Sequence, residues 1–367
     1  MKKIVFGITS LCLGGAERVL VDIVNKLCTK YDITIFTLYG NGEFQKQLNK
    51  KVKLLHVYDK DYYSLSPLKR KWISVQMACG LLRNRIYNKY IKDKFDIEIA
   101  FLEGPITWIF SKKSNARKIA WIHNDIEDVF GNGSKARLKQ NLNKKCYQKF
   151  DDLVFVSKDN MKKFKKYFPD NENNKQVIYN YLNCEDVLKK ADIGEANEIK
   201  DSNVSFVQVS RIVEQKALFR LLEVHKKLIA DNYKHTIYIV GDGPLIEELE
   251  EKIKEYKLSK SFVLLGKKEN PYPYIKKSDY FMLTSFYEGY PMVLLEGKAL
   301  NKYILLTDSA ARETLIDYDP KMIVSNTEEG IYDGIKKLIE ERPKVDLKNT
   351  FDNNASLEKI IKLIEGE

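Results

Sequence analysis

The chain has 367 residues, a length at which two domains are more common than one hydrophobic core. Hydrophobic residues make up 44% and aromatic residues 11%, and no run reaches the roughly 18 apolar residues that an integral membrane protein needs for a spanning helix. The net charge of +11 is uneven: residues 1–200 hold 37 Lys and Arg against 23 Asp and Glu (+14), and residues 201–367 hold 25 against 28 (−3). This asymmetry indicates an anionic partner for the first half, either nucleic acid or an acidic lipid surface.

The N-terminal segment allows two interpretations. Two lysines, an apolar stretch and small residues imitate a signal peptide in MKKIVFGITSLCLGGA. However, Thr9 and Ser10 interrupt the apolar stretch, and AERVLVDIVNKL continues as an amphipathic helix. We therefore favour a strand, a loop and a helix, with the signal peptide as the alternative.

The cysteines indicate the compartment. They are odd in number, widely spaced and free of any CxxC pair, so neither a disulfide framework nor a zinc site is indicated. A reducing cytoplasm fits this pattern, which is made by Cys12, Cys28, Cys79, Cys146 and Cys184.

Short apolar runs alternate with helical stretches along the chain, as strands of a parallel sheet buried on both faces do. The alternation pauses at a polar stretch near residues 180–203 and then starts again. This predicts an α/β fold of two doubly wound, Rossmann-like domains, residues 1–182 and 183–350. Residues 351–367 are predicted to form a helix that packs back toward the N-terminal domain. The predicted strands are KIVFGIT, DITIFTL, KVKLLHVY, DIEIAFL, KIAWIH and DLVFVS, then VSFVQVS, TIYIVG, SFVLLG, YFMLTS and YILLTD.

Loops that follow the strands matter most, because ligands of such domains bind at the carboxyl ends of the strands. Gly14 and Gly15 stand between the first strand and its helix, where backbone amides can hold an anion, although a glycine pair is often only a turn. His123 and Asn124 follow the strand KIAWIH. A lone histidine in such a place is more often structural than catalytic.

The second half repeats this arrangement. Arg211 ends a strand and Lys216 follows five residues later, which suits a diphosphate through forked donors and a point charge, or else forms a surface ion pair. The VGDGPL turn, with Pro244 at the first position of a helix, is interpreted as mainly structural.

The stretch SFYEGYPMVLLEGKAL contains two glutamates separated by seven residues. Pro291 suits the first turn of a helix whose free amides would hold a phosphate. Glu296, inside that apolar helix, can accept hydrogen bonds from the two vicinal hydroxyls of a ribose, at roughly 1.5 to 3 kcal/mol each. Glu288 would lie nearer to whatever is attached to the diphosphate. Either glutamate alone would be taken for a solvated side chain, so the prediction depends on the whole group.

These motifs together resemble the retaining GT-B glycosyltransferases of family four, two Rossmann-like domains that face a cleft. The resemblance covers nearly the whole chain. It includes the family's EX7E pattern, which the spacing from Glu288 to Glu296 matches. The stretch from NPYPYIKKSD to YEGYP is similar to bacterial enzymes that build capsular, lipopolysaccharide-type or wall polysaccharides. It is carried by GGAERVL, WIHND, VSRIVEQK, VGDGPL and NPYPYIKKSDYFMLTSFYEGYPMVLLEGKAL.

The resemblance implies a role for each matching residue. Arg211 and Lys216 would neutralise the diphosphate of the donor, Glu296 would hold its ribose, and Glu288 and His123 would act at the donor sugar as the catalytic pair. The remaining donor-binding positions are Gly14, Gly15, Gly266, Lys267, Gly289, Tyr290 and Pro291, with the base near Gly266 and Lys267. Ala217 departs from the family, which commonly has a glycine after the lysine, and Asn124 separates His123 from Asp125, whose role stays open.

The implied reaction transfers a hexose or N-acetylhexosamine from a nucleotide sugar, by resemblance UDP-linked, to a saccharide acceptor with retention of configuration. The resemblance implies that this acceptor is polymeric or linked to a lipid, of the polyprenyl type. We expect no metal or other cofactor, because cations and helix amides can stabilise the leaving diphosphate. Asp59 and Asp61 in YDKDY mimic the metal-binding DxD of another glycosyltransferase fold and are interpreted as a loop.

The basic first half then has a candidate role at a membrane. Lys and Arg mix with aromatic and apolar residues in SPLKRKWISVQMACGLLRNRIYNKY and KARLKQNLNKKCYQKF, which favours peripheral docking on the anionic inner face of the plasma membrane over a merely solvated face. Nucleic acid is disfavoured because no recognised binding module is present. The rival functions are a GT-B nucleotide-sugar epimerase, a non-catalytic partner subunit and a nicotinamide dehydrogenase.

Overall fold

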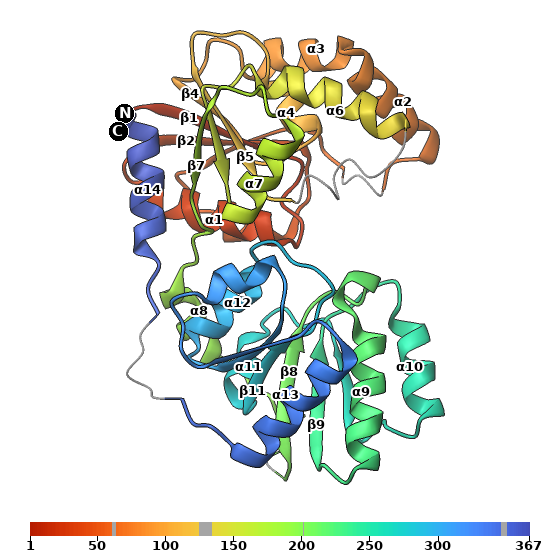
Figure 1. The fold of residues 1–367 in the computed structure, drawn as a ribbon. Helices are drawn as coiled ribbons and strands as arrows, with labels where there is room; N and C mark the ends of the chain where they lie inside the picture. Colours follow the sequence, from red (N-terminus) through yellow and green to blue (C-terminus); the bar gives the residue numbers. More distant parts are fainter. Residues whose placement is uncertain (61–63, 125–133, 201, 346–350) are drawn as a thin grey trace. The chain divides into compact units, whose positions relative to one another are not determined.

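The chain divides into two compact domains, each built on one parallel sheet (Figure 1). The computed structural model describes residues 1–60, 64–124, 134–200, 202–345 and 351–367. The N-terminal domain consists of Met1–Tyr181 with Asn354–Glu367, and the C-terminal domain of Leu182–Asn353. The predicted boundary stood one residue later, after residue 182. Two Rossmann-like parallel-sheet domains were predicted, and the structure confirms them.

The N-terminal sheet has seven strands in the order β3-β2-β1-β4-β5-β6-β7, all parallel. The segment after Met1 and Lys2 is therefore a buried strand near the middle of the sheet, as the strand interpretation predicts. Its strands are β1 (Lys3–Ile8), β2 (Asp32–Tyr39), β3 (Lys53–Tyr58), β4 (Ile97–Ala100), β5 (Arg117–Ile122), β6 (Asp152–Phe155) and β7 (Asn174–Val177). Its helices are α1 (Gly15–Leu27), η1 (Glu43–Gln47), α2 (Pro67–Cys79), α3 (Leu81–Tyr90), α4 (Pro105–Phe110), α6 (Ser134–Tyr147) and α7 (Lys158–Tyr167).

The C-terminal sheet has six strands in the order β10-β9-β8-β11-β12-β13, again all parallel. The short edge strand β13 was not predicted, because four partly buried or exposed residues do not make the long apolar run of a strand that is buried on both faces. The strands are β8 (Val204–Val209), β9 (His235–Val240), β10 (Phe262–Gly266), β11 (Tyr280–Leu283), β12 (Tyr303–Thr307) and β13 (Lys321–Val324). The helices are α8 (Cys184–Ala191), η2 (Glu214–Lys216), α9 (Leu218–Ala230), α10 (Ile246–Glu255), α11 (Tyr272–Lys277), α12 (Met292–Ala299), η3 (Ala310–Leu315) and α13 (Glu328–Glu341).

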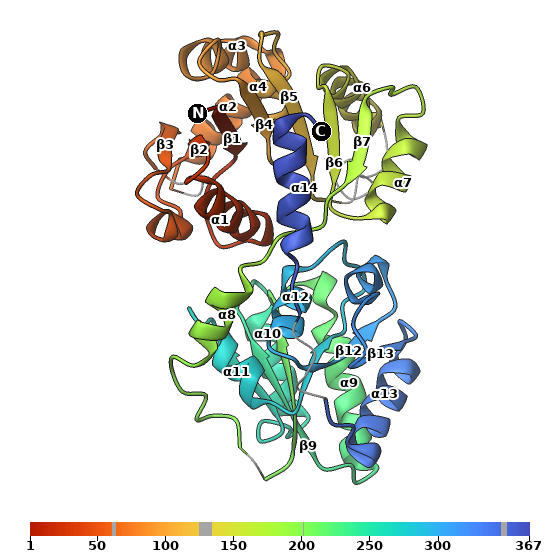
Figure 2. The same ribbon diagram turned by 90° about the vertical axis from the view of Figure 1, so that its left-hand side faces the viewer.

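The terminal helix α14 (Asn354–Glu365) belongs to the N-terminal domain, beside its sheet (Figure 2). Its apolar face is buried, and its last turn is bonded to the N-terminal strands. Arg117 donates to the carbonyl of Leu363 at 2.7 Å, and Lys2 and Tyr31 each reach the carboxylate of Glu365 at 2.6 Å. These donors lower the pKa of Glu365 to about 2. Charge and hydrogen bonds thus attach the helix to this domain.

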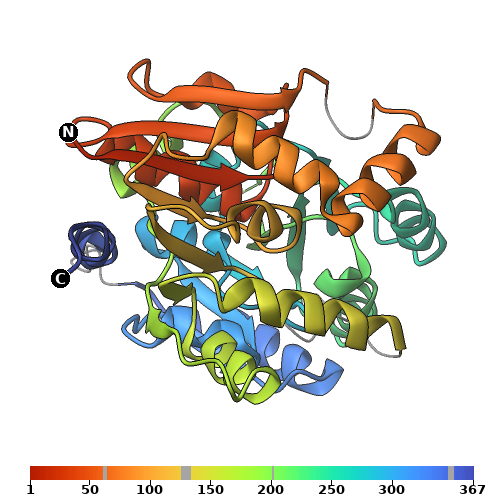
Figure 3. The same ribbon diagram turned by 90° about the horizontal axis from the view of Figure 1, so that it is seen from above.

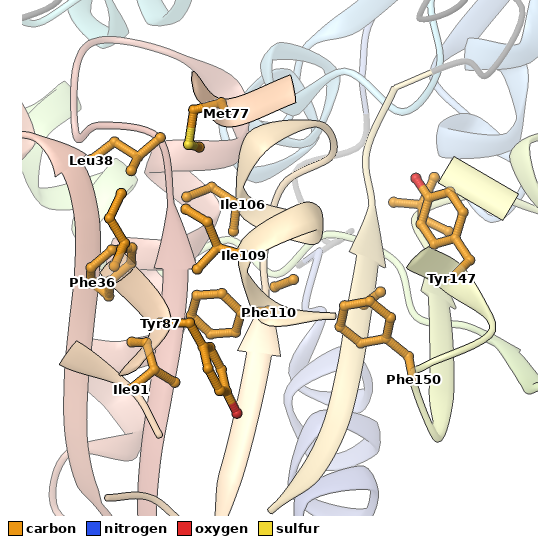
Figure 4. Packing of buried hydrophobic residues seen from close by; sticks show 14 of the residues in the cluster. Phe36, Leu38, Met77, Tyr87, Ile91, Ile106, Ile109, Phe110, Tyr147 and Phe150 are labelled. Atoms are coloured by element: carbon orange, nitrogen blue, oxygen red, sulfur yellow. The ribbon is translucent and has the colours of Figure 1, made fainter. Parts of the chain in front are cut away.

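Each domain has its own hydrophobic core. Figure 4 shows the N-terminal one, where Phe110 of α4 packs near Phe36 of β2, and Met77 of α2 points toward Leu38 and Ile106. Such burial supplies the main driving force for folding. Among the described residues, no helix is both long enough and apolar enough to span a membrane.

Candidate functional site

The loops after β8 and β11 carry most of the predicted site. These two strands are neighbours in the sheet, although β9 and β10 intervene in sequence. The crossover connections leave in opposite directions from this point, so the two loops lie side by side at the carboxyl edge. Sheet order therefore brings Lys216 and Glu288 together across 72 residues of chain.

Glu288 forms an ion pair with Lys216, and both side chains are largely buried. The hydroxyl of Ser285 donates to the same oxygen, Oε1, at 2.6 Å. Within the described part of the chain both partners contact Oε1, so Oε2 stays available as an acceptor. Lys216 has three donor hydrogens, of which Glu288 needs one. A second anion can therefore be bound by the same ammonium group.

Main-chain contacts fix the distance between the two loops. The N–H of Phe286 donates to the carbonyl of Gln215 at 2.9 Å, and the side-chain amide of Gln215 donates to the carbonyl of Tyr287 at 3.0 Å. Gln215 thus binds the two consecutive residues that precede Glu288, and it places its neighbour Lys216 against Glu288. This role could not be predicted from the sequence, because a single Gln between two charged residues has no distinctive pattern.

Arg220 attaches the same loop to α9. Its guanidinium donates to the carbonyl of Thr284 at 2.7 Å and to the carbonyl of Asn326 at 3.1 Å, and it lies 4.4 Å from the ring centre of Phe286. Burial lowers the pKa of Arg220 from its ordinary value. Three contacts from one rigid side chain hold the start of the loop, which supports the position of Glu288.

Ala217 explains how the loop tolerates a departure from the family. It has φ of 53° and ψ of 35°, the left-handed conformation that favours glycine, and it caps the N-terminus of α9. An alanine here costs about 1 kcal/mol relative to glycine. The tight turn after Lys216 is therefore kept with Ala217 in place of glycine.

Arg211 is exposed just after β8, and its guanidinium contacts no partner among the residues that the structure describes. The VGDGPL turn packs directly against this loop: a Cβ on Gly243 would lie 2.3 Å from the carbonyl oxygen of Ile212, and one on Gly241 would lie 1.9 Å from that of Ser210. The structural interpretation of this motif fits these contacts. Pro244 was expected at the first helical position, but α10 begins two residues later, because Leu245 occupies the N-cap.

Glu296 lies in the middle of α12, and Pro291 stands at its N-cap. The hydroxyl of Tyr272, the first residue of α11, donates to Glu296 Oε1 at 3.1 Å. Gly289 and Tyr290 precede this helix. Gly266 ends β10 with φ of 69°, and the exposed Lys267 follows it.

In the N-terminal domain, Gly14 is the N-cap of α1 and Gly15 its first residue. The carboxylate of Glu17 folds back on this end of the helix, since a Cβ on Gly14 would lie 2.2 Å from its Oε2. Burial raises the pKa of Glu17. The sequence analysis did not consider that a side chain of α1 would itself cover this N-terminus.

His123 follows β5 and packs its ring against Phe101, with ring centres 4.7 Å apart. Burial lowers the pKa of His123 to about 3, so the ring is neutral at physiological pH. Its Nε2 atom is buried and has no hydrogen-bond partner within the described ranges. The side-chain amide of Asn160 donates to the carbonyl of His123 at 3.3 Å.

Glu103 is a buried residue near His123 that the sequence analysis missed. It follows β4, which lies between β1 and β5, and its carboxylate accepts the backbone N–H of Asn124 at 2.6 Å and the side-chain amide of Asn124 at 3.0 Å. Burial raises its pKa, and these hydrogen bonds partly offset the shift. The pattern Glu-Gly-Pro at residues 103–105, so similar to EGYP, is the signal that could have found it.

The predicted site residues thus occur in two groups. Arg211, Lys216, Glu288, Glu296 and the loop residues around them belong to the C-terminal domain, and Gly14, Gly15 and His123 to the N-terminal domain. Asp61 and Asp125 lie outside the described residues, and Asp59 is an exposed residue bonded to His56. No group of three or more potential metal ligands occurs within the described ranges.

Comparison with known proteins finds a family model, curated relatives and solved structures that are similar to this chain. Residues 189–357 match the model of the family Glycosyl transferases group 1. A relative from Campylobacter jejuni, N-acetylgalactosamine-N,N'-diacetylbacillosaminyl-diphospho-undecaprenol 4-alpha-N-acetylgalactosaminyltransferase, is 25% identical over 97% of this chain and 94% of its own. Anabaena HepE in complex with UDP and glucose has a TM-score of 0.75 at 16% identity, and sucrose-phosphate synthase from Thermosynechococcus elongatus 0.77 at 11%; the two alignments cover 100% of this chain and 100% and 99% of theirs. These two structures support the GT-B fold alone. The family match thus covers most of the C-terminal domain, and the solved structures extend the likeness in fold to the whole chain.

Proposed function

We propose that this protein transfers a hexose or an N-acetylhexosamine from a UDP-sugar to a lipid-linked or polymeric saccharide in bacterial surface polysaccharide synthesis, with retention of configuration. The observation that carries the proposal is the C-terminal switch point, where Lys216 is paired with Glu288 and Arg211 is exposed without a partner in the described structure. The names of the relatives support it: one acts on a diphospho-undecaprenol saccharide, and HepE was crystallised with UDP and glucose.

The charge arrangement suits departure of a diphosphate. Breaking the glycosidic bond increases negative charge on the leaving oxygen, so donors that meet it stabilise the transition state more than the ground state. Arg211 offers a forked guanidinium, and Lys216 keeps donor hydrogens beyond the one that binds Glu288. The first amides of α12 add donors at the same edge. These groups supply the required charge stabilisation with no metal, which is part of the proposal.

The other roles follow from position. Glu296, bonded by Tyr272, accepts the ribose hydroxyls, and Glu288 contacts the donor sugar through Oε2. Gly266 and Lys267 contact the base, and Gly289, Tyr290 and Pro291 shape the phosphate loop. His123 acts as a neutral ring on the donor sugar, and Gly14 and Gly15 approach the phosphates.

A lipid-linked acceptor implies work at a membrane. We place the protein in the cytoplasm, peripheral on the inner face of the plasma membrane, where the basic N-terminal half meets anionic lipid. No nucleic acid partner is proposed.

The test is a panel of nucleotide sugars offered to the purified protein with EDTA present, scored for binding and for release of the nucleotide. Arg211→Ala and Glu296→Ala are compared with wild type and with Lys337→Ala, an exposed lysine of α13. We expect one UDP-sugar to bind and slowly release UDP, and both site variants to lose at least tenfold in kcat/KM, about 1.4 kcal/mol, while the control does not.

Three results would reject the proposal. A requirement for a divalent ion would overturn the cationic mechanism. Binding without turnover on any acceptor would indicate a non-catalytic partner subunit, and conversion of the donor to an epimer without an acceptor would indicate an epimerase.

A further inference from the structure

Helix α2 exposes an apolar stripe to solvent. The side chains of Leu68, Trp72 and Val75 are 82%, 59% and 54% exposed, and their spacing of four and three residues puts them on one face of the helix. Leu81 at the start of α3 is 74% exposed. Three large apolar side chains on one face of a helix, with a fourth at the start of the next helix, are more than the single scattered apolar residues of an ordinary surface. Folding of the domain does not account for them.

The opposite face of α2 is already buried. Ile73 and Met77 belong to the N-terminal core, and Figure 4 shows Met77 pointing into it. Ser66 caps the start of the helix and accepts the N–H of Lys69, and Gly80 ends it with φ of 87°. The helix is thus fixed by its core face and its two ends, so the exposed stripe is not a core face that turned outward. Figures 1 and 3 place α2 and α3 at the side of the domain opposite α14.

The charges around the stripe all have one sign. Residues 62–92 contain no Asp or Glu and seven basic residues, of which Lys69, Lys71, Arg85, Lys89 and Lys92 are exposed. Lys69 and Lys71 flank the stripe directly. An apolar band with a tryptophan, bordered by lysines and arginines, is typical of a helix that lies in the headgroup layer of an anionic bilayer.

We propose that α2 lies in the surface of an anionic phospholipid bilayer, with Leu68, Trp72, Val75 and Leu81 inserted and the flanking Lys and Arg side chains at the headgroups. A second copy of this chain is the weaker occupant, because a twofold interface on this face would bring the positive patches of both copies together. The contact serves the proposed function, on which its biological purpose rests, by placing the enzyme beside a lipid-linked acceptor.

The test is sedimentation of the full chain with vesicles of phosphatidylcholine alone or with phosphatidylglycerol. We expect binding to the anionic vesicles only, weakened at raised salt. The variant Leu68→Ser/Trp72→Ser/Val75→Ser should bind at least about tenfold less. The matched control is Leu188→Ser/Ile193→Ser, two apolar residues of the C-terminal domain that are 50% and 66% exposed, and it should bind as wild type does.

Fluorescence locates the contact. The chain has three tryptophans, so the difference between wild type and Trp72→Phe isolates the signal of Trp72. Its emission should shift to the blue on anionic vesicles and be quenched by brominated lipid chains. The proposal is overturned if the serine variant binds vesicles as wild type does, if Trp72 is not quenched, or if light scattering shows a dimer that the serine variant abolishes.

The outcome is separable from that of the proposed function. Release of UDP from the donor requires no membrane, so the serine variant should keep it unchanged. Vesicle binding without turnover of any donor would reject the proposed reaction but would still support the proposal that α2 binds the membrane. Turnover without vesicle binding would reject the membrane surface alone.

Discussion

Each domain carries a glutamate and a glycine at the same place in its topology. The fourth strand of each sheet, β4 and β11, is the neighbour of the first, and each is followed by Glu-Gly and then by a proline at the start of a helix. Glu288 is paired with the cation of Lys216, whereas Glu103 accepts neutral amide donors from Asn124. The fold thus places a carboxylate at the same topological position in both domains, and the two carboxylates differ in their partners. In our interpretation, the C-terminal carboxylate presents charge to a ligand, and the N-terminal one positions a loop.

Removing the cation tests this difference most strongly. Lys216→Met leaves Glu288 largely buried beside Ser285 alone, and removes a proposed phosphate donor. We expect kcat/KM to fall about 10²–10³-fold, because both the pair and the transition-state contact are lost.

The double variant Lys216→Met/Glu288→Gln is the control for coupling in this pair. It should lose less than the product of the single losses, because the two residues act as a unit. Losses that multiply independently would show that the ion pair has no role in the reaction.

Glu103→Leu should act mainly on stability. It leaves the buried N–H of Asn124 without its acceptor, at about 1–3 kcal/mol in the free energy of unfolding. Denaturant unfolding of the N-terminal domain measures this, and Glu103→Gln, which keeps one acceptor, should cost less. If Glu103→Leu instead abolished UDP release without loss of stability, Glu103 would be a ligand-contacting residue like Glu288.

The C-terminal core contains buried groups that stay neutral. His235 donates from Nδ1 to the carbonyl of Tyr233 at 2.9 Å, so its Nε2 accepts from Nδ1 of His225 at 2.8 Å, and Ser261 donates to Nε2 of His225 at 2.9 Å. Chiefly by burial, the pKa of His225 is lowered to about 2 and that of His235 to about 4.

This chain of neutral rings makes stability depend on pH. The unfolded histidines bind protons below a pKa of about 6.5, whereas the folded ones do not, so stability is complete above that pH and is lost as pH falls toward 4. His235 alone should lower the free energy of unfolding by about 2 kcal/mol between pH 7 and pH 5. Denaturant titrations at both pH values measure this. His235→Gln should flatten the dependence, and an unchanged slope in this variant would contradict the prediction.

Arg220→Met tests whether the EGYP loop needs its attachment to α9. It removes two hydrogen bonds to carbonyls and keeps an apolar contact with Phe286. We expect kcat to fall about tenfold while the dissociation constant for UDP changes less, because Lys216 and Arg211 remain in place. Equal losses in both quantities, with a lower melting temperature, would indicate a purely structural role.

The smallest effect is expected from the loss of the Tyr272 hydroxyl, which bonds to Glu296. Tyr272→Phe removes one hydrogen bond to its carboxylate, about 0.5–1.5 kcal/mol, and should raise the dissociation constant for UDP about threefold to tenfold. Calorimetric titration measures this, with deoxyuridine diphosphate, which lacks a ribose hydroxyl, as the matched ligand. An unchanged ratio between the two nucleotides in Glu296→Ala would contradict the ribose assignment.

The sequence by itself determined the order of strands and helices, because buried parallel strands are continuous apolar runs that are visible locally. It also determined the pair Glu288 and Glu296, whose spacing is local. The contacts of Glu103 with Asn124 could not be predicted from the sequence, because they depend on β4 lying between β1 and β5. The contacts of Gln215 and Arg220 depend likewise on β8 lying beside β11.

Tertiary structure alone decided which face of α2 is exposed. Leu68, Trp72 and Val75 are no less apolar than Ile73 and Met77, so hydrophobic pattern could not choose between the two faces. Packing chose, because Ile73 and Met77 fill the core beside Leu38 and Ile106. Among the described residues, that core leaves no place for Leu68, Trp72 and Val75, which therefore remain exposed to solvent.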